Sequence, residues 1–179
     1  MKKPALVNIA HLFMLIGGMP TVLATCSDTQ PLTPFTAAWT GNTVWLREWL
    51  EGGGSPNATD ENGDSLLYLS TGPKGSLEVT RLLLQRGADP NLCKEGGYSP
   101  LMNAASWSSI KAVELLLAYG ADVCYRSANG KNAYDVAMTT KPRNAGLIRL
   151  LAERVNDDCG SDTKKEVDTT QSGQADQAD

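Results

Sequence analysis

The stretch that decides the fold runs from residue 76 to residue 91 and reads SLEVTRLLLQRGADPN. Parts of it recur at a regular spacing on both sides. Gly53 and Gly120 stand at the positions that correspond to Gly87 before and after it, each at the end of a Leu-containing segment. A fixed period of about 33 residues is typical of a stacked solenoid, in which each repeat buries its apolar face against its neighbours.

A second motif supports the same register. It reads NGDSLLY, GGYSPLM and NGKNAYD at 62–68, 96–102 and 129–135, and Gly63, Gly97 and Gly130 repeat the period of the first motif. Each copy predicts a glycine turn, a polar residue that starts a helix, and a short apolar helix. Ser99 and Pro100 show this most clearly, because serine caps a helix start and proline fits the first helical position. A longer helix, expected at 77–85 and 110–119, then ends at a glycine.

These motifs resemble the ankyrin-repeat family. Residues 99–105, SPLMNAA, are similar to the family's Thr-Pro-Leu-His-x-Ala-Ala segment, with Met102 in place of the usual histidine. The resemblance implies an all-α solenoid of about four helix-turn-helix repeats with β-hairpin-like loops. We expect the repeats to cover residues 32–155, with boundaries near 32–59, 60–93, 94–126 and 127–155.

The N-terminal segment predicts the compartment. Lys2 and Lys3 precede an apolar stretch that ends in small residues at Ala24, which is the order of a bacterial secretory signal peptide. We therefore expect residues 1–24 to be a cleaved signal peptide, residues 25–31 to be a leader, and the mature protein to be periplasmic.

Two alternatives for this segment stay open. Residues 4–25 carry no formal charge, and a stretch of this length could just span a bilayer as an uncleaved membrane anchor. The tetrapeptide that ends at Cys26 reads LATC and resembles a lipobox, so Cys26 is a lipidation candidate. Either alternative would attach the protein to the membrane through its N-terminus.

The C-terminal segment differs in composition from the repeats. Residues 156–179 are polar, with Val167 as the only sizeable apolar side chain. They contain seven acidic residues, from Asp157 onward, and two lysines. Such a segment buries too little apolar surface to offset its ordering entropy, so we expect a disordered acidic tail. Residues 25–156 contain 13 acids and 12 bases. This balance lacks the basic excess that nucleic-acid binding requires.

Catalytic and metal sites are not indicated. His11 is the only histidine and lies in the predicted signal peptide, so the mature chain would lack the residue on which histidine-based nucleophilic and metal sites depend. No glycine run matches a phosphate-binding loop. We expect a protein that is not an enzyme and binds no cofactor or metal.

The four cysteines raise the question of disulfides, because an even count is typical of exported proteins. Cys93 and Cys124 fall in the loops of adjacent repeats and are the disulfide candidate. The alternative is a pair of partly buried thiols. Cys26 and Cys159 flank opposite ends of the stack, so we do not expect them to pair.

The family resemblance also predicts a binding surface. In ankyrin repeats the hairpin tips and the exposed positions of the first helices usually form the concave contact face. On this chain the tips would display Asp60, Glu61, Asn62, Lys94, Glu95 and Ser127. The predicted protein-binding residues are Trp39, Tyr68, Tyr98, Met102, Trp107, Tyr125 and Arg126. Trp45 and Trp49 are expected to pack against the core.

Two classes of function follow from the resemblance. The chain resembles small exported ankyrin proteins of bacteria, which look like accessory modules for one partner enzyme. We therefore expect it to bind and regulate one partner enzyme, for example as an inhibitor or immunity protein against a secreted toxin or lipase. The alternatives are an accessory factor for a periplasmic enzyme such as a catalase, or an architectural envelope scaffold. We expect the free chain to be a monomer.

Overall fold

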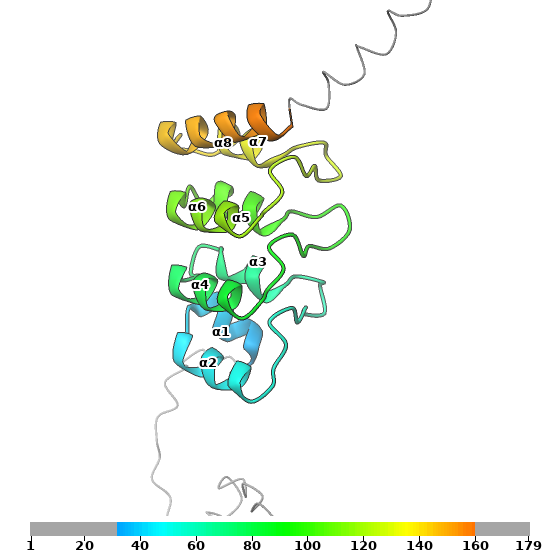
Figure 1. The fold of residues 1–179 in the computed structure, drawn as a ribbon, viewed down its shortest axis with the longest axis vertical. Helices are drawn as coiled ribbons and strands as arrows, with labels where there is room; N and C mark the ends of the chain where they lie inside the picture. The colour runs from blue at the N-terminus through cyan, green and yellow to red at the C-terminus, as the bar shows by residue number, and fades with distance from the viewer. Residues whose placement is uncertain (1–31, 160–179) are drawn as a thin grey trace, which may run out of the picture. The chain divides into compact units, whose positions relative to one another are not determined.

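The computed structural model describes residues 32–159, which form four helix pairs stacked in a column (Figure 1). The pairs are formed by α1 (Pro34–Thr40) with α2 (Thr43–Glu51), α3 (Leu66–Ser70) with α4 (Leu77–Gln85), α5 (Pro100–Ser106) with α6 (Ile110–Ala118), and α7 (Ala133–Thr139) with α8 (Ala145–Asp158). Within the described range the only β pairing is a single bridge between Thr59 and Ser65. The predicted all-α solenoid is confirmed, and α4 has the bounds expected from the sequence.

The helices begin where the polar residues of the repeat stand. Among the described helices, all except α6 start after a Ser, Thr or Asn whose side chain accepts a hydrogen bond from a backbone amide of the first turn. Ser99 Oγ accepts from the Met102 amide at 3.3 Å, and Pro100 occupies the first helical position. Thr33 and Asn132 form capping boxes at α1 and α7. Such caps satisfy amides that have no partner within the helix.

The long helices end at the repeated glycines. Gly87 follows α4 with φ of 84°, and Gly120 follows α6 with φ of 83°. At the first of these ends the Ala88 amide donates to the Leu83 carbonyl at 3.0 Å. A residue in the left-handed region allows this reversal, and glycine adopts it without steric cost.

The core is a continuous column of side chains between the pairs. Leu83, Leu116 and Leu151 come from successive second helices and are each fully buried. Trp45 and Trp49 are partly buried against this core, as expected for packing residues. Because each layer is covered by the next, the stability of one repeat depends on its neighbours.

An asparagine joins each of the first two loops to the next repeat. Asn91 donates from Nδ2 to the Gly120 carbonyl at 3.1 Å and accepts from the Asp122 amide at 2.7 Å. Asn57, at the equivalent position of the preceding repeat, accepts from the Asp89 amide at 2.7 Å and lies 3.4 Å from the Gly87 carbonyl. The sequence period is therefore also a period of hydrogen bonds between repeats.

In the third loop between repeats, a disulfide stands at the position equivalent to Asn57 and Asn91. Cys124 is the counterpart of Asn91 in the next repeat and is bonded to Cys159, at the C-cap of α8, with a Cα–Cα distance of 5.7 Å. The expected bond between Cys93 and Cys124 is wrong, because Cys93 is a free thiol. The sequence leaves a bond between adjacent loops open, but the end of the longer last helix reaches Cys124 instead.

The last helix also corrects the predicted start of the tail. The sequence predicts disorder from residue 156, but α8 continues to Asp158 and Cys159 is held by its disulfide. The predicted signal peptide at 1–24, the leader at 25–31, Cys26 and the remainder of the predicted tail lie outside the described residues. Among residues 32–159, none of the helices is long and apolar enough to cross a membrane.

Candidate protein-binding surface

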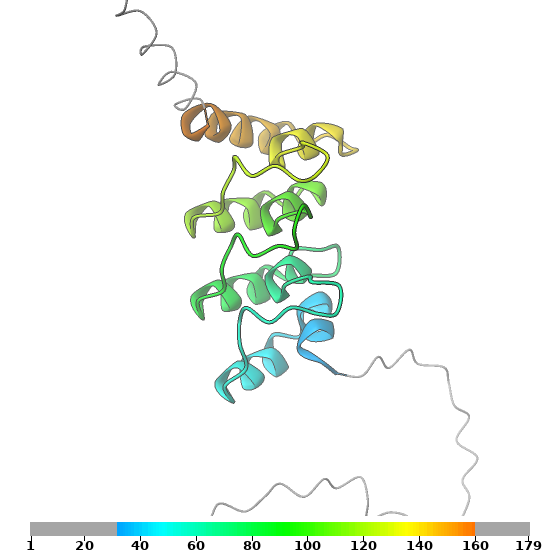
Figure 2. The same cartoon turned by 90° about the vertical axis from the view of Figure 1, so that its right-hand side faces the viewer.

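The two ends of the helix pairs form two sides of the stack. We call one the hairpin side, where the loops 52–65, 86–99 and 119–132 connect successive repeats. The other is the turn side, where 41–42, 71–76, 107–109 and 140–144 connect the two helices within a pair. Figure 2 faces the hairpin side, and the loops run across the front of the stack.

Tyr68 and Tyr98 lie on the hairpin side among charged groups. Lys94 forms an ion pair with Asp64 across two loops, at 3.2 Å between Nζ and Oδ1. Burial raises the pKa of Tyr68, Asp64 raises it further, and Lys94 opposes this change. Tyr98 also interacts electrostatically with Tyr68, and both rings are partly buried. The hydroxyl of Tyr68 therefore stays protonated at neutral pH.

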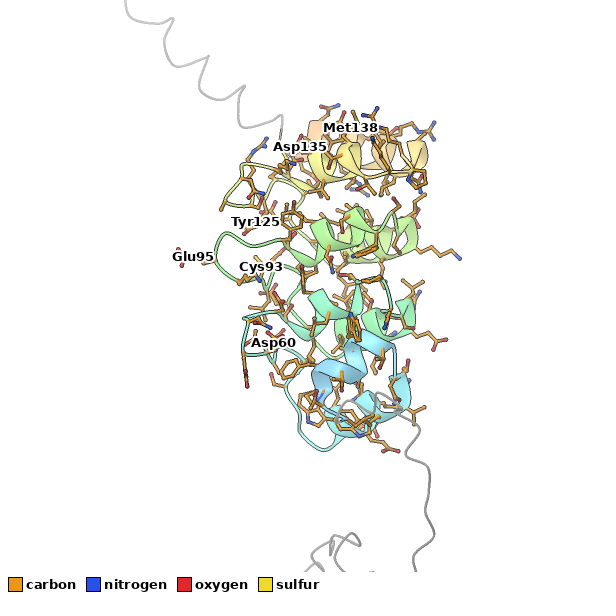
Figure 3. All side chains as sticks on the ribbon, turned by 180° about the vertical axis from the view of Figure 1, so that it is seen from behind. Asp60, Cys93, Glu95, Tyr125, Asp135 and Met138 are labelled. Carbon is orange, nitrogen blue, oxygen red and sulfur yellow. A yellow bond between two sulfur atoms is a disulfide. The ribbon has the colours of Figure 1, made fainter. Side chains whose placement is uncertain are left out.

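Tyr125 continues this arrangement into the next loop. Its hydroxyl donates to the Gly97 carbonyl at 3.0 Å, and a hydrogen bond with Cys93 raises the pKa of Tyr125. Figure 3 shows Tyr125, Cys93, Glu95 and Asp60 along one edge of the stack. The ring is held by a contact with the preceding loop, so its position depends on the stacking of repeats.

Arg126 is exposed and is tied to its own repeat. Its Nη1 donates to the Gly130 carbonyl at 2.8 Å and lies 3.4 Å from Asp135 Oδ2. Asp135 also accepts from the Asn132 amide at the start of α7. An exposed ion pair of this kind contributes about 0–1 kcal/mol, so it leaves Arg126 available to a partner at little cost.

Met102 is not a surface residue, which corrects our prediction. Its side chain is 1% exposed, and all of α5 from Pro100 to Ala105 is buried. The reason is that α5 lies in an inner repeat and packs against α3, α6 and α7. The prediction also missed Asn103, whose Nδ2 donates to the Tyr68 carbonyl at 2.8 Å and to Thr71 Oγ1 at 3.1 Å. This buried amide ties the third repeat to the second.

The two tryptophans of the prediction are exposed, but on the turn side. Trp107 is 53% exposed at the C-cap of α5, and Trp39 is 37% exposed near the end of α1. Lys74 Nζ lies 4.3 Å from the centre of the Trp39 ring, a cation–π contact. The sequence did not point to Lys74. The predicted residues therefore divide among three places: the hairpin side, the turn side and the core.

The described residues hold no recognisable metal centre. Within 32–159 no group of three or more His, Cys, Asp or Glu side chains could bind a metal ion. The hairpin side offers aromatic rings, hydroxyls and charged groups. Aromatic residues and Arg are enriched at protein interfaces, and polar residues form the rim around them.

Comparison with known proteins agrees with this arrangement. The family model "Ankyrin repeats (3 copies)" matches residues 35–127, which is just over half of the 179 residues. The fourth pair, α7 with α8, follows the matched region and extends the stack.

The chain also matches several curated proteins. The chain is 36% identical over 104 residues to "Ankyrin repeat and SAM domain-containing protein 6" of Rattus norvegicus, covering 55% of the chain and 12% of that protein. It is 33% identical over 92 residues to "Protein phosphatase 1 regulatory subunit 12A" of Mus musculus, covering 51% of the chain and 9% of that protein.

A bacterial relative covers more of both chains. The "Putative ankyrin repeat-containing protein" of Treponema pallidum (strain Nichols) is 34% identical over 114 residues, covering 63% of this chain and 37% of that protein. The chain matches only 12% of the length of the rat relative and 9% of the length of the mouse relative. Ankyrin repeats generally mediate protein–protein interactions without catalysis. By its matched repeats and its stacked helix pairs, this chain belongs to the ankyrin-repeat family.

Proposed function

We propose that this chain is a non-catalytic protein-binding module of the bacterial cell envelope, which binds one partner enzyme and regulates it. The observation that carries the proposal is the set of tyrosines on the hairpin side. Tyr68 lies in α3, Tyr98 and Tyr125 lie in the next two loops of the hairpin side, and each is partly buried. The Tyr125 ring is held by its hydrogen bond with Gly97 before a partner arrives, and preorganised aromatic groups lose little entropy on binding.

The form of regulation is proposed from the same surface. An inhibitor or immunity protein needs a rigid face that covers the partner's active site or a surface beside it. The contacts of Tyr125 with Gly97, and of Lys94 with Asp64, hold neighbouring loops together in this way. An accessory role toward an envelope enzyme such as a catalase would use the same face without inhibition.

The proposed compartment draws support from the disulfide. The bond between Cys124 and Cys159 joins the last loop to the last helix. Disulfides form and persist in oxidising compartments, and the bacterial periplasm is one of them. We therefore propose a periplasmic location, reached through the signal segment expected at residues 1–24.

The test is to capture the partner in the envelope and then measure its activity. The tagged full-length chain is cross-linked in intact cells, and the bound protein is identified by mass spectrometry and purified. A change in the activity of that enzyme at an equimolar ratio supports regulation, and unchanged activity supports the scaffold alternative. Absence of any stoichiometric partner would refute the proposal.

A matched pair of variants places the contact. Tyr68→Ala should weaken the complex by about 2 kcal/mol or more if the tyrosine is central to the interface. Tyr119→Ala is the control, because Tyr119 is exposed at 43% at the end of α6 and lies outside the tyrosine set. Because Tyr119 also lies on the hairpin side, equal affinity for the two variants would remove the tyrosine set, and not the whole side, from the model.

A further inference from the structure

The turn side carries a row of side chains that the proposed function does not use. Trp39 lies beside the second turn, since a Cβ on Gly72 would come within 3.9 Å of its ring. Lys74 of that turn lies over the same ring. Gly72 and Trp107 line one cavity, and Trp107 also lines the next. The row therefore crosses all four repeats.

Two cavities hollow the surface on either side of Trp107. One has a volume of about 660 Å³ between the third and fourth turns, where Lys141, Pro142 and Arg143 form part of the wall. The other has a volume of about 450 Å³ between the second and third turns, with Pro73 and Thr80 in its wall. A half-exposed indole between two hollows offers a binding partner one ridge and two recesses.

The four turns of this side carry charges of one sign. The four turns contain Lys74, Lys141 and Arg143 and no Asp or Glu. Among residues 32–159 none of these three cations forms an ion pair, although Arg143 donates from Nε to the Met138 carbonyl at 3.1 Å. The nearest carboxylate along the chain is that of Glu78, which is exposed in the first turn of α4, directly after the second turn. This sign bias is local, because acids and bases nearly balance over residues 25–156.

We propose that the turn side is a second docking surface, which binds an extended acidic segment of a partner protein that carries apolar side chains between its carboxylates. The carboxylates would meet Lys74, Lys141 and Arg143, and the apolar side chains would enter the hollows beside Trp107. Charge complementarity favours an anionic partner, since oppositely charged patches steer association and exclude wrong partners. The inference goes beyond the proposed function, because it uses none of the hairpin-side tyrosines.

The hollows favour a peptide over a lipid surface. Side chains that alternate along an extended segment protrude far enough to fill recesses on either side of a ridge. A flat layer of anionic head groups would meet the cations and the indole but would leave both cavities unfilled. An acidic segment therefore matches both the charge and the shape of the turn side.

The experiment uses the full-length chain and a synthetic fluorescein-labelled peptide, Glu-Glu-Leu repeated four times. Fluorescence anisotropy measures its binding at low and high salt. We expect binding that weakens as salt is added, because charge attraction is screened. A peptide with lysine in place of glutamate should not bind. Equal binding of the two peptides, or salt-independent binding, would overturn the proposal.

Variants locate the site. Trp107→Ala combined with Lys141→Glu should weaken binding of the acidic peptide by roughly tenfold or more. The matched control is Tyr119→Ala with Arg154→Glu, which replaces an exposed aromatic side chain at the end of α6 and reverses an exposed cation in α8. It should bind like the wild type, as should Tyr68→Ala. A tenfold loss of peptide affinity in the control variant would refute the assignment. Unchanged peptide affinity in the turn-side variant, with its thermal transition intact, would also refute it.

The same assay distinguishes two other occupants of the turn side, an anionic lipid surface and the protein's own C-terminal residues. Vesicles of anionic phosphatidylglycerol are added in place of the peptide, and binding that only the vesicles show would assign the surface to lipid. A chain that ends after Cys159 tests the protein's own acidic residues 160–179. If its affinity for the acidic peptide rises tenfold or more, the occupant is the protein's own tail and the partner proposal fails. Unchanged affinity supports a separate partner.

Discussion

Cys124 is bonded to Cys159 at the position where Asn91 contacts Gly120 one repeat earlier. Both Asn91 and Cys124 donate their amide to an aspartate two residues before them, Asp89 at 2.9 Å and Asp122 at 2.8 Å. Their backbone environments are therefore alike, and only the side-chain link differs. At the third loop, a covalent bond to the last helix takes the place of the two hydrogen bonds that Asn91 makes with the repeat after its own.

The disulfide should stabilise the end of the stack. It closes a loop with a sequence separation of 35 residues, and the chain-entropy model then gives roughly 4 kcal/mol. Cys124→Ser should lower the free energy of unfolding by about 2–4 kcal/mol, as measured by urea denaturation. Cys93→Ser is the control and should change it little, since Cys93 is unpaired. A Cys124→Ser curve that overlays the wild type would contradict this account.

The state of the cysteines can be read directly. Without reductant, alkylation followed by peptide mass mapping should label Cys93 and leave Cys124 and Cys159 joined. Cys93 reacts because its side chain is only partly buried. Recovery of a peptide that links Cys93 to Cys124 would restore the pairing expected from the sequence and overturn the structural one.

Asn91 should contribute to the stability of the fold although its side chain is exposed. Asn91→Ala removes its hydrogen bonds with Gly120 and Asp122, each worth about 0.5–1.5 kcal/mol net. We expect the free energy of unfolding to fall by about 1–3 kcal/mol. Thermal or urea denaturation measures this loss, with Asn129→Ala as the control because Asn129 is exposed in a loop. Equal stability of both variants would show that the contact contributes nothing.

Leu83 tests the register of the core. Its side chain is fully buried in α4, so Leu83→Ala should cost roughly 2–5 kcal/mol through lost burial and a new cavity. Because neighbouring repeats are coupled, the loss should extend beyond α4. Hydrogen exchange should therefore show weaker protection in α6 as well. A thermal transition that does not move would refute the stacking described here.

Ser108 is a site where the chain can be stabilised. It has φ of 56°, the only positive value for a non-glycine residue among residues 32–159, and Gly41 has φ of 78° before the equivalent helix start. The left-handed region costs roughly 1–2 kcal/mol for a residue with a Cβ. Ser108→Gly should therefore raise stability by about 0.5–1 kcal/mol after its greater unfolded-state freedom is counted. Ser106→Gly, at the last residue of α5, should lower it instead, because it removes the hydrogen bond from Ser106 Oγ to the Asn103 carbonyl and adds unfolded-state freedom. A fall in melting temperature for Ser108→Gly would contradict this expectation.

Much of the fold could be predicted because it is local and periodic. The glycines at 87 and 120, the caps at Ser99 and Asn132, and the bounds of α4 follow from residue type and spacing within a few residues of each position. Each requires only that a polar side chain meet a nearby amide or that a glycine adopt a left-handed conformation. The family resemblance then implied the stacking.

What the tertiary structure decided depends on contacts between repeats. The burial of Met102 was missed because it depends on the helices that cover α5. The Cys124–Cys159 bond depends on how far α8 extends, although a cysteine spacing close to the repeat period was a signal available in the sequence. Trp107 and Arg126 were expected on one binding surface. Trp107 lies at the C-terminal end of α5 on the turn side, whereas Arg126 lies in a loop of the hairpin side. Spacing along the chain determined the repeat, and packing in three dimensions decided which residues share a surface.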